Sequence, residues 1–328
     1  MSRLPLCVPA NAITIGNFDG VHLGHKALVD ACRNHARAHG GKVIALTFDP
    51  HPSVLLRPDH APQRLTTFAQ RRDALLAAGA DEVVRLEPTP ALLDKSAAEF
   101  LGWVLDEFKP GLIAEGEDFH FGKHRSGNVH TMRAQAAERG CGVQIVAGVE
   151  VTLNDHSVVR ASSSLVRWLL SHGRVADAGC VLGRQYEYIG TVQQGDRLGR
   201  QIQIPTANVV SECLMPMNGA YAGMGVLPDG TVLPAAINVG MRPTVHGVQR
   251  RVEVHLLREA SGGWAPLPGL PEYGWELRVR FGHFLRDEMK FPGLPALLGQ
   301  IQRDIARVRG LITPRVGLAG DARVPANA

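Results

Sequence analysis

Apolar and polar positions follow two different patterns along the chain, and the change comes at about residue 173. Before it, short apolar runs alternate with segments of helical periodicity. The runs are nearly continuous, as expected of strands covered on both faces of a parallel sheet. Strands are predicted at 12–15, 42–48, 81–86, 112–114 and 142–147. Strands that alternate with helices predict a doubly wound parallel α/β sheet.

The helices of this half have recognisable start signals. Thr66 or Thr67 is a candidate N-cap, because a hydroxyl there accepts a hydrogen bond from a free backbone N–H of the first turn. Ser96 and Glu99 have the spacing of a capping box. Helices are predicted at 25–38, 66–78 and 96–108, with a further one ending near 139.

After residue 182 the apolar runs become short and are separated by Gly and Pro, which is typical of antiparallel strands joined by turns. Strands are predicted at 186–192, 221–227, 232–238, 251–257 and 276–281. They predict a small antiparallel barrel, followed by one amphipathic helix after Gly293. The apolar stripe expected to pack that helix on the core is Leu294, Leu297, Leu298, Ile301 and Ile305. The Pro/Gly/Ala-rich tail at 311–328 is predicted to be disordered.

The composition is that of a globular protein with two domains, expected at 1–182 and 183–310, since 328 residues suffice for two cores. Only 5% of residues are aromatic, too few for a surface on which nucleic-acid bases stack. The net charge of +4 is explained by a small anionic substrate or by a solvated basic surface. Five widely spaced cysteines indicate reduced thiols, and no apolar run approaches membrane-spanning length, so we expect a cytoplasmic protein.

The stretch 12–26 carries the clearest chemistry. A buried strand is followed by a turn containing Gly16 and Gly20 and then by a helix, an arrangement that binds anions through free N–H groups and the helix dipole. His22 and His25 lie three residues apart at this turn. Two imidazoles beside a phosphate site can stabilise the charge that builds on an α-phosphate under attack. The pattern Gly-x-Phe-Asp-x-x-His-x-Gly-His resembles the signature of nucleotidyltransferases, enzymes that move an adenylyl or cytidylyl group onto a phosphate.

Two later segments of the first half are expected at the same edge of the sheet, where the strands end, and a third closes the domain. Two prolines stiffen 47–52, either as part of the site or as a plain connector. The glycine-bounded loop 116–122 combines acidic and aromatic residues, as a pocket for a ring would. The serines of 162–164 are most often helix caps, but together with Arg167 they can also hold a polyphosphate.

Two features of the second half carry chemistry. The segment 195–208 joins a glycine loop to Pro-Thr-Ala-Asn, and the oxygens of Thr206 and Asn208 are hard ligands of the kind that Mg²⁺ accepts beside phosphate oxygens. The alternation of 251–256 places Val252 and Val254 on the core face, and Glu253 on the other. Such a carboxylate is most often a solvated surface charge, but aimed at a ligand it can take the proton of an attacking hydroxyl.

The first half resembles the FMN adenylyltransferase module of the bacterial bifunctional riboflavin kinase/FAD synthetases, through the His-x-Gly-His turn, 47–52, 116–122 and the Ser-Ser-x-x-x-Arg run that ends at Arg167. The resemblance implies that His22 and His25 act at the α-phosphate of ATP. The ATP-binding residues that it implies are Gly16, Phe18, Asp19, Gly24, Ser163, Ser164 and Arg167. The loop residues that it implies around the flavin and the nucleotide are Asp49, His51, Pro52, Asp118, Phe119, Phe121 and Gly122.

The second half resembles the riboflavin kinase domain of the same family, through 182–184, 205–208, 238–244, 253–255 and 285–291. The resemblance implies a six-stranded antiparallel barrel with a C-terminal helix. It also implies that Gly199, Thr206 and Asn208 lie at ATP and Mg²⁺, and that Glu253 is the base toward the ribityl hydroxyl. The family pattern has Gly where Gln203 stands, Val where Ala220 stands and Asp where Arg258 stands, and the insertion at 260–271 is longer.

The sequence therefore predicts a bifunctional enzyme that makes FAD from riboflavin, with ATP as co-substrate, Mg²⁺ as cofactor and FMN as intermediate. It is expected as a monomer or weak homo-oligomer without nucleic-acid or membrane partners. The main alternative is an FMN adenylyltransferase whose kinase-like domain is inactive and only binds flavin, since the Gln203 side chain can crowd ATP. A non-catalytic regulator that touches RNA and a transferase with another acceptor are the further hypotheses.

Overall fold

The computed structural model describes residues 10–195, 204–244, 247–258 and 269–312. It divides into two compact units, one of Met1–Val151 with Val159–Ser163 and one of Thr152–Val158 with Ser164–Ala328. Gly199 and Gln203 and the predicted tail beyond 312 lie outside the described residues. The four described cysteines, Cys32, Cys141, Cys180 and Cys213, are free thiols.

The first unit is built on a five-stranded sheet of order β3-β2-β1-β4-β7 in which all neighbouring strands are parallel. The strands are β1 (Ala12–Gly16), β2 (Val43–Phe48), β3 (Glu82–Leu86), β4 (Leu112–Gly116) and β7 (Gly142–Val146). The chain runs outward from β1 to β3 and then returns to the other side of β1 with β4. The neighbours β1 and β4 therefore form the topological switch point, beyond whose carboxyl ends parallel sheets bind ligands.

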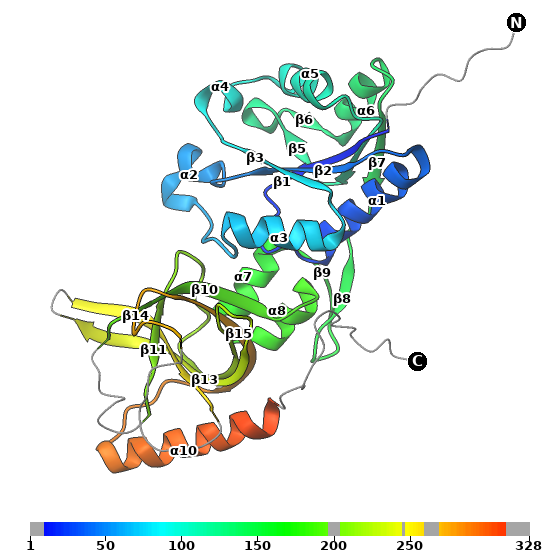
Figure 1. Ribbon diagram of the computed structural model, residues 1–328. Coiled ribbons are helices and arrows are strands. Elements are labelled where there is room, and N and C mark those ends of the chain that lie inside the picture. The colour runs from blue at the N-terminus through cyan, green and yellow to red at the C-terminus, as the bar shows by residue number, and fades with distance from the viewer. Residues whose placement is uncertain (1–9, 196–203, 245–246, 259–268, 313–328) are drawn as a thin grey trace, which may run out of the picture. The chain divides into compact units, whose positions relative to one another are not determined.

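Helices cover both faces of this sheet, which confirms the predicted doubly wound fold (Figure 1). On one face α1 (Leu23–His39) and α3 (Phe68–Ala78) pack on Ala12, Val43 and Ala45. On the other, α5 (Ala97–Phe108) and α6 (Val129–Ala137) pack on Ile13, Ile15 and Leu46. Both predicted capping positions are used, because Thr67 with Gln70 and Ser96 with Glu99 form capping boxes.

The local patterns did not predict the short elements of the first half. The helix expected from residue 25 begins at Leu23, because extended backbone at His22 makes that residue the N-cap. The unpredicted elements are α2 (Ser53–Leu56), η1 (Pro58–His60), α4 (Pro90–Leu93), β5 (His120–Phe121), η2 (Lys123–Arg125), β6 (Gly127–Asn128), β8 (Glu150–Thr152) and β9 (Val158–Arg160). Each of them has at most four residues, too few for a helical or strand period to appear.

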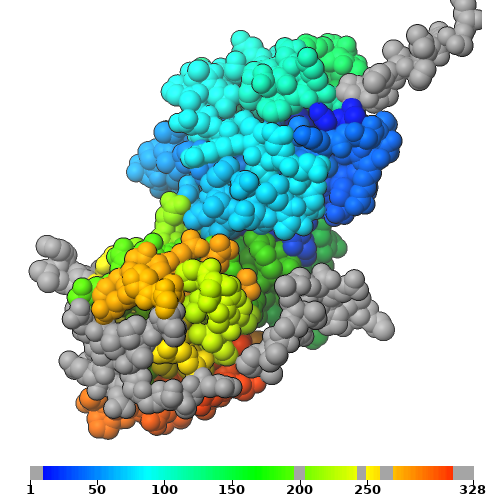
Figure 2. Space-filling model, in the orientation of Figure 1, coloured from blue at the N-terminus to red at the C-terminus, as the bar shows by residue number. Residues whose placement is uncertain are grey.

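The second unit contains α7 (Ser163–Ser171) from Ser164 onward, α8 (Val175–Leu182) and a closed antiparallel barrel of order β10-β11-β14-β13-β12-β15. Its strands are β10 (Tyr186–Gln193), β11 (Ala207–Val210), β12 (Gly219–Val226), β13 (Val232–Thr244), β14 (Gly247–Leu256) and β15 (Glu276–Arg286). Buried rings of Tyr188, Tyr221 and Phe281 help to fill the core of the barrel. The space-filling view shows that the surface of the first unit is closed where the ribbon drawing leaves gaps (Figure 2). The six-stranded antiparallel barrel implied by the resemblance is confirmed.

The C-terminal helix α10 (Leu294–Leu311) packs on the barrel through its second half, where Val308 contacts a cluster that includes Ala222 and Leu285. The prediction for Leu294 was wrong, because this side chain is 47% exposed. A buried Asp304 lies on the packed face instead, and its carboxylate accepts hydrogen bonds from Arg286 Nη2 at 2.8 Å and Nε at 3.0 Å. Because Arg286 compensates its charge, Asp304 can lie on the packed face of the helix. A prediction from apolar periodicity does not place a charged residue there.

Candidate functional sites

The turn between β1 and α1 holds the two histidines in a fixed pair. The His22 ring is buried and stacks on the half-buried His25 ring, with 3.6 Å between ring centroids, and the Phe18 ring meets His25 edge-on. Gly24 leaves room for the pair, since a Cβ there would lie 3.1 Å from the His22 ring. Phe18 and Val21 have positive φ angles, a costly backbone for such side chains that surrounding contacts must maintain. Both imidazoles thus stand at the N-terminus of α1, where anions are favoured.

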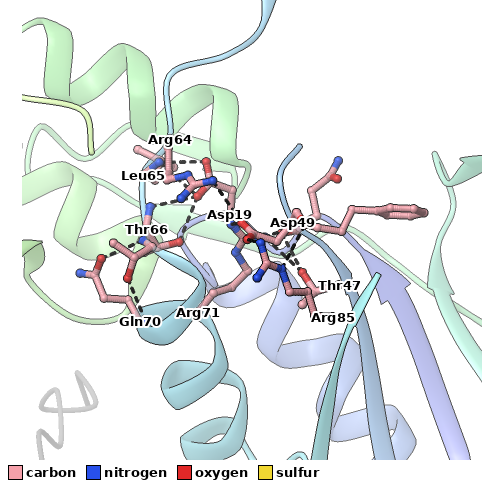
Figure 3. Close-up of polar contacts among 12 residues, drawn as sticks. Asp19, Thr47, Asp49, Arg64, Leu65, Thr66, Gln70, Arg71 and Arg85 are labelled. Carbon is pink, nitrogen blue, oxygen red and sulfur yellow. Dashed lines mark hydrogen bonds and ion pairs between the residues drawn. The ribbon is translucent and has the colours of Figure 1, made fainter. Parts of the chain in front are cut away.

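Asp19 fastens this turn to the segment before α3 (Figure 3). Its buried carboxylate accepts hydrogen bonds from the backbone N–H groups of Leu65 and Thr66 and from the Thr66 hydroxyl, at 2.9–3.1 Å. Its main-chain oxygen accepts a hydrogen bond from Ser163 Oγ at 2.7 Å. These contacts give Asp19 a structural role in holding the turn, and direct ATP binding by this residue stays a prediction.

A second buried carboxylate, Asp49, follows β2 and gathers three arginines (Figure 3). It pairs with Arg85 at 2.8 Å, Arg64 at 3.2 Å and the buried Arg71 at 3.4 Å. Arg71 also donates to the main-chain oxygen of Phe48 and to the Thr47 hydroxyl. Because Thr47 Oγ1 in turn donates to the main-chain oxygen of Asn17 at 3.2 Å, the network supports the turn that carries the histidines.

Replacing Asp49 with asparagine is expected to cost about 3–5 kcal/mol of unfolding free energy, because a buried arginine loses its counter-charge. Urea unfolding of the full chain measures the cost. The matched control is Asp30→Asn on α1, since Asp30 forms a half-exposed pair with Arg33 and is expected to contribute about 1 kcal/mol or less. Equal losses in the two variants would contradict the structural role of the Asp49 network.

Of the loop residues predicted around the flavin, some are packed in the core of the first unit and one is exposed to solvent. Phe121 is buried against Phe100, with 6.0 Å between ring centroids. Gly122 has a φ of 73°, and a Cβ there would lie 2.6 Å from backbone atoms of Ala97. Asp118 is exposed, with Arg160 3.8 Å away. Of these residues, Asp118 is therefore the one placed to reach a ligand without rearrangement of the core.

The other predicted loop residues lie close to short elements. Phe119 is half-buried and stacks on Phe121 at 5.7 Å. His51 Nδ1 accepts a hydrogen bond from Ser53 N, and Pro52 is the N-cap of α2. Ser164 and Arg167 lie on α7, which begins at Ser163. Ligand contacts by these residues remain predictions.

In the barrel, three polar side chains occupy one row across neighbouring strands. Asn208 of β11 stands opposite Glu253 of β14, which stands opposite Asn238 of β13. Val252 and Val254 are buried in the core, which confirms that Glu253 belongs to the opposite face. Asn238 Nδ2 lies 3.4 Å from Glu253 Oε2, so the amide orients the carboxylate.

The oxygen ligands predicted for a metal lie at the end of this row. Asn208 Oδ1 is buried, and no hydrogen-bond donor within the described ranges reaches it. Thr206, two residues earlier, is exposed. Next to them His255 Nδ1 lies 2.8 Å from the main-chain oxygen of Pro205, and burial lowers the pKa of His255, which favours a neutral ring. A buried amide oxygen that no donor of the described residues reaches fits a site for a cation such as Mg²⁺.

Comparison with known proteins agrees with both halves of this arrangement. The sequence model described as FAD synthetase matches residues 7–161, and the one described as riboflavin kinase matches residues 182–312. A bifunctional riboflavin kinase/FMN adenylyltransferase of Escherichia coli K12 is 33% identical over 92% of this chain and 94% of its own length. The chain belongs to this bifunctional family. The Pseudomonas fluorescens member is 36% identical over 92% of this chain and 93% of its own length.

A solved structure shows the same fold over nearly the whole chain. It is described as a macrolide-efflux protein from Streptococcus pneumoniae, and it matches with a TM-score of 0.79 and 25% identity, covering 94% of this chain and 95% of that one. The word efflux in this description applies to the Streptococcus pneumoniae protein, and the match supports the fold of this chain. Within the described ranges of this family member, no helix is both long and apolar enough to cross a membrane.

Sequence reasoning did not single out several buried or hydrogen-bonded residues that lie around the candidate sites. Arg71 and Glu115 make their decisive contacts with residues far away in the sequence. Asn17 lies inside the glycine turn, and its buried Oδ1 is reached by no donor in the described part of the chain. Its position between Gly16 and Phe18 was the feature of the sequence from which Asn17 could have been proposed as a site residue. Asn238 belongs to a quoted family motif, but its contact with Glu253 depends on strand register.

Proposed function

We propose that this chain makes FAD from riboflavin in two steps at two sites. The second unit phosphorylates riboflavin with ATP, and the first transfers an adenylyl group from ATP to the resulting FMN and releases pyrophosphate. The observation that carries this function is the match of one chain to both enzyme families, FAD synthetase and riboflavin kinase. No observation favours an inactive kinase-like half.

For adenylyl transfer, we assign charge stabilisation at the α-phosphate to His22 and His25. The nucleophile is a phosphate oxygen of FMN that is already an anion, so the site needs positioning and charge stabilisation more than a strong base. The stacked pair at the N-terminus of α1 supports this assignment. Gly16, Phe18, Asp19 and Gly24 would shape the turn around ATP, and Ser163, Ser164 and Arg167 would hold its phosphates.

For riboflavin phosphorylation, we assign Glu253 as the base. Its carboxylate would accept the proton of the ribityl hydroxyl as that oxygen attacks the γ-phosphorus of ATP, the bond to the bridging oxygen breaks and ADP leaves. Asn238 would keep the carboxylate turned toward the substrate, which the 3.4 Å contact supports. Thr206 and Asn208 would hold Mg²⁺, which when bound neutralises charge on the phosphates.

Several broader properties belong to the same proposal. We place the division between the two catalytic domains near residue 182, with a disordered tail after 310. We expect a cytoplasmic protein that acts on small molecules as a monomer or weak homo-oligomer, without a nucleic-acid partner. Flavin and ATP as substrates follow from the family.

Chromatography of the flavins tests the two activities separately. The purified chain is incubated with ATP and Mg²⁺ and with either riboflavin or FMN, and FAD is expected from both. FAD formed from FMN alone would mean that the barrel binds flavin without phosphorylating it. FAD from neither would overturn the proposed function, and loss of both activities on chelation with restoration by Mg²⁺ would support the metal requirement.

A further inference from the structure

A buried carboxyl group, Glu115, lies at the topological switch point of the first unit. It belongs to β4, is 1% exposed and directly precedes Gly116, where the loop 116–122 begins. On the neighbouring strand β1, Ile15 directly precedes Gly16, where the histidine-bearing turn begins. Glu115 therefore lies between the starting points of two loops that we assign to the adenylyltransferase site.

The seam between β1 and β4 opens at this carboxyl group. The two strands pair only at Ala12 with Leu112 and at Ile13 with Ile113. On their other sides both strands continue regularly, since β1 pairs with β2 as far as Gly16 and β4 pairs with β7 as far as Gly116. The opening is thus confined to the switch point and is not fraying of the strand ends.

The Glu115 side chain satisfies a backbone group that the open seam leaves without a strand partner. Glu115 Oε1 accepts the Ile15 N–H at 2.5 Å and lies 3.5 Å from Thr14 Oγ1. Ile13 lies in the paired part of the seam, and its main-chain oxygen also accepts a hydrogen bond from the Cys32 thiol of α1 at 3.3 Å. A buried N–H without a partner is costly, so the carboxyl group determines where the backbone of β1 lies just before the turn.

We propose that Glu115 is a positioning residue for adenylyl transfer: its carboxyl group holds the seam open and fixes the backbone at Ile15, from which Gly16 and Asn17 continue into the phosphate-binding turn. The inference rests on the proposed adenylyltransferase function. A displacement of about 1 Å at reacting groups can cost about 100-fold in rate, so a contact below the site can control its activity.

Burial favours the neutral acid form of this group. Burial raises the pKa of Glu115 well above its usual value, and the two hydrogen bonds from Ile15 and Thr14 offset this only in part. The titratable group that faces it from α1 is the Cys32 thiol, whose own pKa is raised by burial and by Glu115. From β7, Ile145 stands opposite it in the ladder. Ionisation would place an uncompensated charge at the seam.

The test measures both activities and the urea unfolding of the same preparation, because the kinase rate reports on the second unit and the unfolding curve shows whether the first unit, which contains Glu115, is folded. Glu115→Leu removes the acceptor at similar size and is expected to lower the rate of FAD formation from FMN by about 100-fold while the kinase rate is unchanged. Glu115→Gln keeps an acceptor oxygen and is expected to restore most of that rate. The matched control is Ile113→Val, which removes a methylene from the same strand without touching the seam contact and should leave both rates unchanged.

The pH profile supplies a readout that a purely structural role would not move. As pH rises toward the raised pKa, the wild-type rate of FAD formation is expected to fall relative to that of Glu115→Gln, which cannot ionise. Full FAD formation by Glu115→Leu, an equal loss in Ile113→Val, or a rate for Glu115→Gln as low as that of Glu115→Leu would each overturn the inference. If Glu115→Leu fails to fold, the rate of Glu115→Gln decides, since a loss of about 100-fold in that variant would contradict a role as hydrogen-bond acceptor. A wild type that makes no FAD from FMN refutes the proposed function instead.

Discussion

His22→Ala is expected to lower kcat for FAD formation from FMN by about 10²–10³-fold, the usual loss when one preorganised donor to a developing charge is removed. His25→Ala is expected to have an effect of the same order, because the two rings stack and face the same position at the start of α1. The phosphorylation of riboflavin should continue at the wild-type rate in both variants. Steady-state kinetics with FMN and with riboflavin, on one preparation of each variant, measure both quantities.

The same helix offers a matched control. His35 and His39 also stack, with 4.2 Å between ring centroids, but they lie in the last two turns of α1, far along the helix from the turn. His39→Ala should therefore leave both activities unchanged. Similar losses in His39→Ala and His22→Ala would mean that the substitutions act through the stability of α1, and the proposed role at the α-phosphate would fail.

Much of the fold was predictable because its signals are local. The five parallel strands are apolar runs, and Thr67 with Gln70 and Ser96 with Glu99 mark helix starts by residue types three positions apart. The face of Glu253 was predictable for the same reason, since strand alternation needs only its neighbours Val252 and Val254. The apolar periodicity of a strand and the residues of a helix cap lie within a few consecutive positions, so the sequence alone contains the whole signal.

The missed features depend on which strands become neighbours. Glu115 accepts its hydrogen bond from Ile15, 100 positions away, and Asp49 pairs with Arg85 on the adjoining strand. The four-residue β11 is recognisable only through its pairing with β10 and β14. Leu294 fits an apolar helical stripe, but α10 contacts the barrel further along, where Asp304 is buried with Arg286. No local pattern contains such information.

The candidate sites show the same division. Gly16, His22 and His25 could be singled out as candidates because a strand, a turn and a helix follow one another directly in the chain. Asn238 was not singled out, because its contact with Glu253 follows from the register that places the two residues opposite each other. Sequence therefore predicted groups that can act on a substrate better than it predicted the groups that orient them.

Glu253→Gln is expected to lower kcat for riboflavin phosphorylation by about 10²–10⁴-fold, the range for removal of a general base, with little change in the KM for ATP. Glutamine keeps the size and an acceptor for Asn238 Nδ2, so the barrel should keep its structure. FAD formation from supplied FMN should proceed at the wild-type rate. The matched control is Glu276→Gln, an exposed carboxylate of β15 paired with Arg278, which should leave both activities unchanged.

The companion variant Asn238→Ala separates positioning from proton transfer. Without the amide, the Glu253 carboxylate remains but loses a hydrogen bond that orients it, so the loss in kcat should be smaller than that of Glu253→Gln. The double variant should then be no slower than Glu253→Gln alone, because residues that act as a unit are not additive. Multiplicative losses would show that Asn238 contacts the substrate independently, and an unimpaired Glu253→Gln would remove Glu253 from the reaction and leave it a surface charge of the strand.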